Sequence, residues 1–102
     1  TVFGSLSKEV IRKVIHANID KVKKCYEDEL RKKPTLQGRV SIKFVIDSNG
    51  SVQLAEVLDD TVNDTTVSQC IASAVQTMEF PAPNGDGIVM VSYPFLLTPP
   101  EK

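Results

Sequence analysis

The sequence predicts an α+β domain with the element order helix, strand, strand, helix, strand. Residues 8–32 carry apolar side chains at helical spacing, and residues 64–78 carry a second helical stripe. Residues 38–58 instead form two runs with apolar residues at every second position, separated by a turn, which is typical of strands with one buried face. Residues 88–97 are a third such run, in which Val89, Val91, Tyr93 and Phe95 alternate with Ile88, Met90, Ser92 and Leu96. We expect a three-stranded antiparallel sheet in the order 2-1-3, with two helices on one face.

The first helix is expected to be unbroken over about 25 residues, because this stretch holds neither Gly nor Pro. Ser7 is the candidate N-cap, since its hydroxyl can accept a hydrogen bond from a free N–H of the first turn. Pro34 stops the helix from continuing. The stripe that faces the core includes one polar residue and consists of Ile11, Val14, Ile15, Asn18, Ile19, Val22, Cys25 and Tyr26.

The first two strands form a predicted hairpin. In the first strand the buried positions are Val40, Ile42, Phe44 and Ile46. The pair Asn49-Gly50 supplies the positive φ values that a tight turn requires. The second strand covers residues 51–58 with Val52 and Leu54 in phase, and a break in the pattern predicts a bulge or the strand end near residues 55–56.

The second helix begins at Asn63 or Asp64, and its buried stripe is Val67, Cys70, Ile71, Ala74 and Met78. The third strand, residues 88–97, contains Pro94. Proline cannot donate to a ladder, so this strand is expected at an edge of the sheet or with an irregularity at Pro94, and its usable edge is expected to end near Tyr93.

Composition and charge describe one small domain. The chain has 102 residues, of which 41% are hydrophobic and 25% charged, with a net charge of −1. Residues 1–43 hold eleven basic and five acidic residues, whereas residues 44–102 hold one lysine and eight acids. A solvated helix face accounts for the basic first half of the chain. The alternatives are an acidic partner, a membrane surface or nucleic acid. No apolar run is long enough for a bilayer, so we expect no membrane insertion. The chain has only six aromatic residues and lacks the interleaving of basic and aromatic residues that single-strand binders use, so we expect no nucleic-acid binding by this domain.

The residues that enzymes and metal sites use are sparse. His16 is the single histidine and falls off the apolar stripe, and with two cysteines it cannot complete a four-ligand zinc site. The acidic loop at Asp59-Asp60 lacks the spacing of a calcium loop. We therefore expect no catalytic residue, metal or cofactor, and conclude that the chain is not an enzyme.

Two features remain as functional candidates. Cys25 and Cys70 lie on the predicted inner faces of their helices, where they form a disulfide in an oxidising compartment or stay as reduced core thiols. The third strand offers unpaired backbone groups that can capture an extended peptide, unless a tail, a loop or a second copy covers them. The predicted partner-binding residues are Ile88, Val89, Met90, Val91, Ser92 and Tyr93.

Three stretches, taken together, resemble the C-terminal domain of TonB. Residues 37–52 resemble its first hairpin, residues 67–80 resemble its second helix running into an aromatic-Pro step, and residues 85–91 resemble the Gly-rich turn into its last strand. The long first helix with Cys25-Tyr26-Glu27, the second cysteine and Tyr93-Pro94-Phe95 are more similar to the AgmX/PglI C-terminal domain family of gliding bacteria.

The resemblance implies a TonB/TolA-like C-terminal domain at residues 4–97, followed by a flexible tail at 98–102. It implies a periplasmic, non-enzymatic part of a larger energy-transducing protein, anchored in the inner membrane and driven by a motor of the ExbB/ExbD or TolQ/TolR type. Its role would be transport or gliding motility, through outer-membrane or periplasmic partners. Peptide capture by the last strand is implied for Val89, Val91 and Tyr93. The alternative is a structural or oligomerisation domain of a cell-envelope complex.

Overall fold

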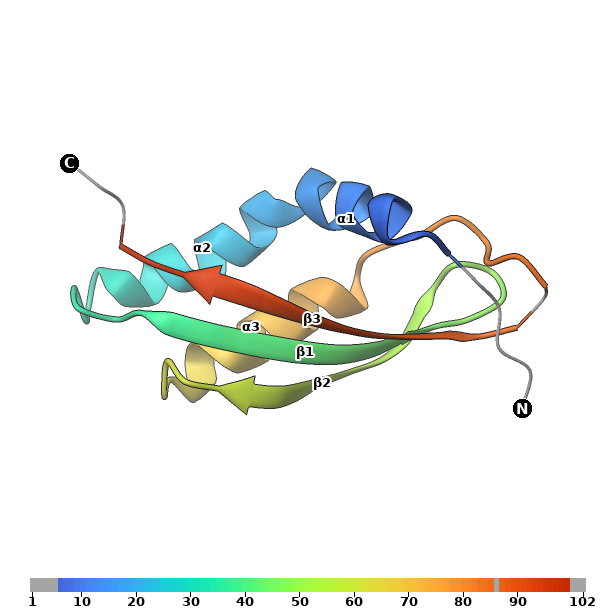
Figure 1. Ribbon diagram of the computed structural model, residues 1–102. Helices are drawn as coiled ribbons and strands as arrows, with labels where there is room; N and C mark the ends of the chain where they lie inside the picture. The colour runs from blue at the N-terminus through green and yellow to red at the C-terminus, as the bar shows by residue number, and fades with distance from the viewer. Residues whose placement is uncertain (1–5, 86, 100–102) are drawn as a thin grey trace.

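A computed structural model of the protein describes residues 6–85 and 87–99. The sheet has the order β2-β1-β3, both pairs are antiparallel, and the fold class predicted from the sequence is confirmed (Figure 1). The outer ends of the predicted domain and tail, at residues 4 and 102, lie outside the described residues. The elements are α1 (Lys8–Ala17), α2 (Ile19–Leu30), β1 (Gly38–Ile46), β2 (Val52–Asp60), α3 (Thr65–Gln76) and β3 (Val89–Leu97).

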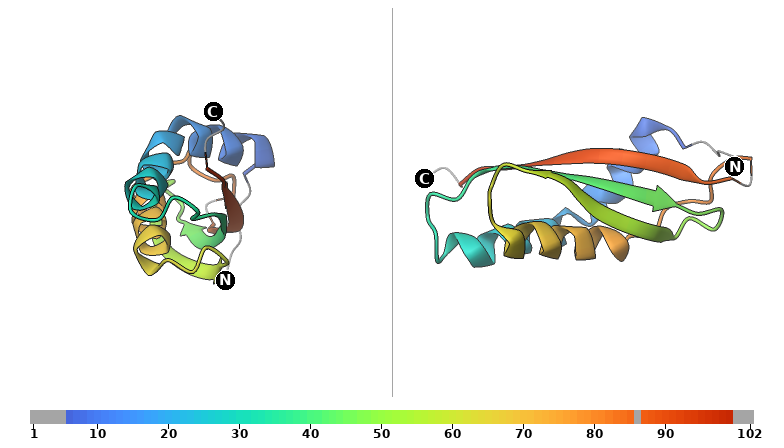
Figure 2. Two further views of the ribbon diagram at one scale, coloured as in Figure 1. Left: turned by 90° about the vertical axis from the view of Figure 1, so that its left-hand side faces the viewer. Right: turned by 90° about the horizontal axis from the view of Figure 1, so that it is seen from below.

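The domain is elongated and has two layers, with extents of 45 × 23 × 17 Å. Helices α2 and α3 lie side by side over one face of the sheet, and no described element covers the other face (Figure 2). Helix α1 leaves this layer and crosses towards the β3 side of the sheet (Figure 2). One long edge of the sheet, β3, therefore lies beside a helix.

The prediction of a single long first helix is wrong, because the helix is interrupted at Asn18. Its side-chain amide donates to the Val14 carbonyl at 2.8 Å. The backbone N–H of Asn18 bonds instead to the Ile15 carbonyl, at 3.1 Å. Asparagine side chains compete with the backbone for hydrogen bonds in this way, which turns a helix or ends it. The structure thus has three helices, and the break allows α1 to change direction.

The core lies between β1 and the helices. The four predicted inward positions of β1 are fully buried, which confirms the alternation read from the sequence. Ser7 caps α1 as predicted, since its hydroxyl accepts from the Val10 N–H at 3.2 Å. Asp64 caps α3 in the same way, from the Val67 N–H at 3.2 Å. Fully buried residues across both layers are Ile15, Val22, Val40, Ile42, Phe44, Ile46, Val67, Ile71 and Val75.

Strand β2 is longer than predicted and carries two irregularities. The register with β1 shifts at two places, which leaves Gln53 and Leu58 as extra residues on β2. The single bulge predicted near residues 55–56 is therefore misplaced.

The first shift changes which side chains of β2 face the core. The sequence predicted that Val52 and Leu54 both face the core. Val52 is buried, but Leu54 is 45% exposed. Ala55 and Val57 oppose inward residues of β1 and pack against the core. One extra residue moves every later side chain to the opposite face, because strand side chains alternate.

The turn between β1 and β2 has one positive φ value, at Gly50 (+91°), where the sequence predicted two. The Gly50 N–H donates to the Asp47 carbonyl at 3.0 Å. The Asp47 carboxylate accepts from the Gln53 side chain and from the N–H groups of Asn49 and Ser51. These hydrogen bonds, led by that of Gln53, hold the pKa of Asp47 below its usual value.

Candidate partner-binding edge

Strand β3 is a regular edge strand. It pairs with β1 without a shift, from Gly38 opposite Leu97 to Ile46 opposite Val89. Pro94 lies inside this run, opposite Ser41, and does not interrupt the pairing with β1. The strand begins at Val89, one residue later than predicted.

The backbone bonds of Arg39 establish which groups of β3 face outward. Its N–H donates to the Thr61 hydroxyl at 2.7 Å, and its carbonyl accepts from the Thr61 N–H at 2.9 Å. Arg39 therefore directs its backbone towards the β2 side. Backbone direction alternates along a strand, so Ser41 does the same, and its pair with Pro94 carries no hydrogen bond. The position that lacks an N–H thus lies on the open side of β3.

The open side of β3 consequently presents every second residue. Met90, Ser92 and Leu96 direct both their N–H and their carbonyl outward, and Pro94 directs only a carbonyl. Val89, Val91, Tyr93 and the other intervening residues bond to β1. Of the six residues predicted from the sequence, only Met90 and Ser92 combine a place within the strand with outward backbone groups.

The side chains of β3 follow the same alternation. Val89, Val91 and Tyr93 are half-buried and pack against the core, whereas Met90 and Ser92 are exposed. Met90 is 49% exposed and Leu96 77%, so apolar surface continues along the outer face of this strand. The predicted residues therefore divide into an inner set that holds the strand and an outer set that is accessible.

A groove of about 360 Å³ lies between the first part of β3 and α1. Its helical wall combines apolar and basic side chains from Leu6, Lys8, Ile11 and Arg12. A second hollow of about 260 Å³ continues beside the last part of β3, with Ile19, Val22 and Lys23 of α2 opposite the strand. The two hollows are called the edge groove below.

The helical wall of the edge groove is a feature that sequence reasoning missed. Ile11 and Ile19 are on the apolar stripe that the sequence revealed, but a continuous helix would not bring α1 alongside β3. The signal was Asn18, a polar residue within that stripe, because the chain breaks there. The basic residues of this half of the chain were assigned to a solvated helix face.

A disulfide joins the two helices of the covering layer. Cys25 of α2 and Cys70 of α3 are bonded, with their Cα atoms 5.7 Å apart. Cys25 is buried, but Cys70 is exposed, contrary to the prediction that both lie on inner faces. The bond thus lies where the two helices meet at the surface, away from the edge groove.

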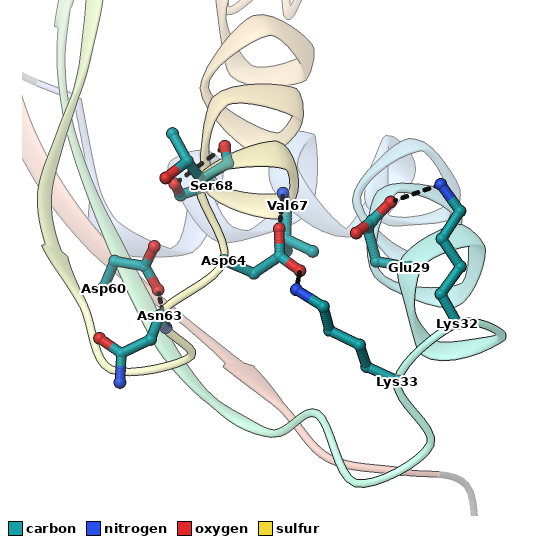
Figure 3. A network of polar contacts seen from close by, with 9 residues as sticks. Glu29, Lys32, Lys33, Asp60, Asn63, Asp64, Val67 and Ser68 are labelled. Carbon is teal, nitrogen blue, oxygen red and sulfur yellow. Dashed lines mark hydrogen bonds and ion pairs between the residues drawn. The ribbon is translucent and has the colours of Figure 1, made fainter.

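A polar network joins the end of α2 to the start of α3 (Figure 3). Lys33 Nζ lies 3.1 Å from Asp64 Oδ2, and Lys32 Nζ lies 3.4 Å from Glu29 Oε1. Burial opposes ionisation of Asp64, but the bonds from Lys33 and the Val67 N–H prevail and lower its pKa. Because each charged group here has a partner, the network holds the helices together rather than forming a site.

The remaining candidates carry no chemistry in the described residues. His16 is exposed on α1, as predicted. In residues 6–85 and 87–99 no three His, Cys, Asp or Glu side chains are grouped as metal ligands. In the same part of the chain, no helix has the length and apolarity to cross a membrane.

Comparison with known proteins identifies a structural neighbour. No protein-family model and no curated protein matches the sequence. Among solved structures, the C-terminal domain of TonB from Helicobacter pylori, determined by NMR in solution, matches with a TM-score of 0.61 and 20% sequence identity. The match covers 96% of this chain and 88% of that one. The chain has the fold of a TonB C-terminal domain.

Proposed function

We propose that this domain is a non-enzymatic coupling module, which binds an extended segment of a partner protein as an additional strand beside β3. The observation that supports the proposal is the open side of β3, where the backbone groups of Met90, Ser92 and Leu96 have no hydrogen-bond partner among the described residues. An extended peptide can pair with such a row and obtain affinity from main-chain hydrogen bonds. Residues 88–93, predicted from the sequence, supply the first half of this row.

The other edge of the sheet is less suited to this role. Strand β2 carries extra residues at Gln53 and Leu58, and such bulges disrupt a ladder and twist an edge away from new partners. Strand β3 has no register shift over its nine residues. A partner strand therefore finds its longest regular template on β3.

The setting of this activity is proposed from likeness. The fold is that of a TonB C-terminal domain, and the sequence motifs resemble the AgmX/PglI gliding-motility branch. We infer a periplasmic domain of a TonB-type energy-transducing protein, anchored in the inner membrane and driven by an ExbB/ExbD or TolQ/TolR type of motor. Its partners would be outer-membrane or periplasmic proteins, in transport or motility. The Cys25–Cys70 disulfide supports an oxidising compartment.

A second candidate function uses the same edge differently. As a structural or oligomerisation domain of an envelope complex, the protein would pair β3 of one copy with β3 of another. The exposed apolar side chains of Met90 and Leu96 favour it, because long apolar edges associate with each other.

Two measurements separate these functions. Sedimentation of the isolated domain over a wide concentration range should give a monomer if β3 is reserved for a partner, and a dimer under the second candidate function. An NMR titration with extended peptides from envelope proteins should slow hydrogen exchange at the N–H groups of Met90, Ser92 and Leu96. Exchange that stays unchanged at these residues with every peptide refutes strand addition. A pull-down from cell envelopes, with this domain as bait, would identify the partner.

A further inference from the structure

The charged residues that line the edge groove, within the part of the chain that the structure describes, are all basic. Lys8 and Arg12 of α1 line the hollow beside the first part of β3, and Lys23 of α2 lines the hollow beside the last part. Among residues 6–85 and 87–99, no acidic side chain lines either hollow. All three basic residues are exposed. A segment that pairs with β3 would therefore extend along a positively charged wall.

These three charges are also free to act on a ligand. The ion pairs of the described residues use Lys32, Lys33 and Arg39, and none uses a basic residue of the edge groove. Other lysines of the same helices, such as Lys13 and Lys24, do not line the edge groove but border hollows on the helix surfaces, and Arg12 borders the hollow of Lys13 as well as the edge groove. Only some of the basic residues in the first half of the chain thus line the edge groove.

We propose that the partner of β3 is an acidic extended peptide, and that Lys8, Arg12 and Lys23 select it by its charge. This inference rests on the proposed function, since the peptide must first add to β3. Backbone bonds to β3 carry little sequence information, because every residue except proline offers the same groups. Discrimination must come from side chains, and complementary charge supplies it together with a faster encounter.

The wall also indicates the rest of the ligand's composition. Leu6, Ile11 and Ile19 are apolar residues of the wall that are buried or half-buried. Side chains of an added strand alternate between two faces, so one face would meet this apolar and basic wall. We expect a segment that mixes apolar residues with Asp or Glu.

A nucleic acid would satisfy the charges but not the strand edge. Its phosphates only accept hydrogen bonds, so they leave the outward carbonyls of Met90, Ser92, Pro94 and Leu96 without donors. The row of alternating donors and acceptors matches a peptide backbone. A single-stranded oligonucleotide is therefore the appropriate competitor in the test.

The test uses labelled peptides as long as β3, which alternate Val with Glu, Gln or Lys, and measures binding by fluorescence anisotropy. We expect the Glu peptide to bind at least about tenfold more tightly than the Lys peptide in about 0.01 M salt, where the Debye length is roughly 30 Å. The difference should shrink in about 0.15 M salt, where that length is roughly 8 Å.

A charge-reversed variant and a matched control complete the test. The variant Arg12→Glu/Lys23→Glu should lose most of the preference for the Glu peptide. The control Lys13→Glu/Lys24→Glu places the same charges one residue away on the same helices, outside the edge groove, and should retain the preference. All four residues are exposed, and thermal unfolding should show that both variants remain folded.

The outcomes separate this inference from the proposed function. Equal binding of the Glu, Gln and Lys peptides, with slowed exchange at Met90 and Ser92, overturns the charge selection and leaves strand addition standing. Equal effects of the variant and its control overturn it as well, because charge at a distance would then explain the preference. An oligonucleotide that competes as well as the Glu peptide also contradicts it. If no peptide binds and no amide of β3 responds, both proposals fail.

Discussion

Lys33 and Asp64 are 31 residues apart in the sequence and form an ion pair of 3.1 Å that connects the end of α2 to the start of α3. Asp64 is 4% exposed and also accepts the Val67 N–H at the start of α3. The Asp64 carboxylate therefore caps α3 and also holds Lys33, in the segment that follows α2. Protonating it weakens both interactions at once.

We predict that the protein loses stability in acid through Asp64. The pKa of Asp64 is lowered in the folded state, so the unfolded state binds the proton more tightly. The stabilisation is fully present above the unfolded value of about 4 and is lost as the pH falls through the folded pKa. Urea unfolding from neutral to acidic pH should show this loss as a fall in the free energy of unfolding.

The variant Asp64→Asn isolates the contribution of this carboxylate. Asparagine remains a good N-cap, but it carries no charge for Lys33 to meet. The variant should be less stable at neutral pH, and its free energy of unfolding should fall less on acidification than that of the unsubstituted protein. Some loss remains, because Asp47 and other carboxylates still bind protons. An identical acid-dependent loss in both proteins would show that Asp64 is not responsible.

Gly50 should be intolerant of substitution for a reason that Gly85 does not share. Both have positive φ, at +91° and +87°. A Cβ on Gly50 would overlap the Phe80 carbonyl oxygen, whereas a Cβ on Gly85 would meet nothing within 4 Å. Gly50→Ala should therefore cost well over the roughly 1 kcal/mol expected from backbone strain alone, and Gly85→Ala about that amount.

Chemical denaturation of both glycine variants provides the measurement. The Gly50 carbonyl also accepts the Phe80 N–H at 2.8 Å, and the Phe80 ring stacks on Phe44 with centroids 5.7 Å apart. Displacing Phe80 would disturb this packing in the core. Equal losses for the two variants would contradict the close approach of the two segments.

The fold was predictable because its elements have strong local signals. Alternation in β1, the caps at Ser7 and Asp64, and the stripe of α3 each depend on near neighbours in the sequence. The predictions failed for the first helix and for β2, and in each case a single residue departs from the pattern of its neighbours. Asn18 ends a helix within an unbroken apolar stripe, and an extra residue at Gln53 reverses the faces of β2.

The candidate site was predictable only in part, for a related reason. The identity of β3 as an edge strand was indicated by Pro94, which cannot donate within a ladder. Which backbone groups of β3 point outward was not predictable, since this depends on how β1 pairs with both of its neighbours, as the bonds between Arg39 and Thr61 reveal. The basic wall was hidden because it depends on the path of α1 after the break at Asn18.

Reduction of the disulfide should destabilise the domain strongly. Cys25 and Cys70 are 45 residues apart, and closing a loop of that length stabilises a chain by about 4 kcal/mol in the chain-entropy description. The bond also joins α2 to α3, which form the covering layer. Denaturant unfolding with and without a reductant should show the loss, and Cys25→Ser/Cys70→Ser should reproduce it without a reductant. A double variant as stable as the oxidised protein would contradict a stabilising role.

The direction of the backbone groups on β3 can be tested with proline substitutions. The Ser92 N–H lies on the open side, so Ser92→Pro should cost at most about 1 kcal/mol of folding stability while it weakens peptide binding. The Val91 N–H bonds to β1, so Val91→Pro removes a ladder hydrogen bond and should destabilise the fold clearly more than Ser92→Pro. Pro94→Ala adds an outward N–H and should strengthen peptide binding without loss of stability. Urea unfolding measures the stability of each variant, and peptide titration measures its binding. Equal destabilisation by Ser92→Pro and Val91→Pro would show that the Ser92 N–H does not point outward.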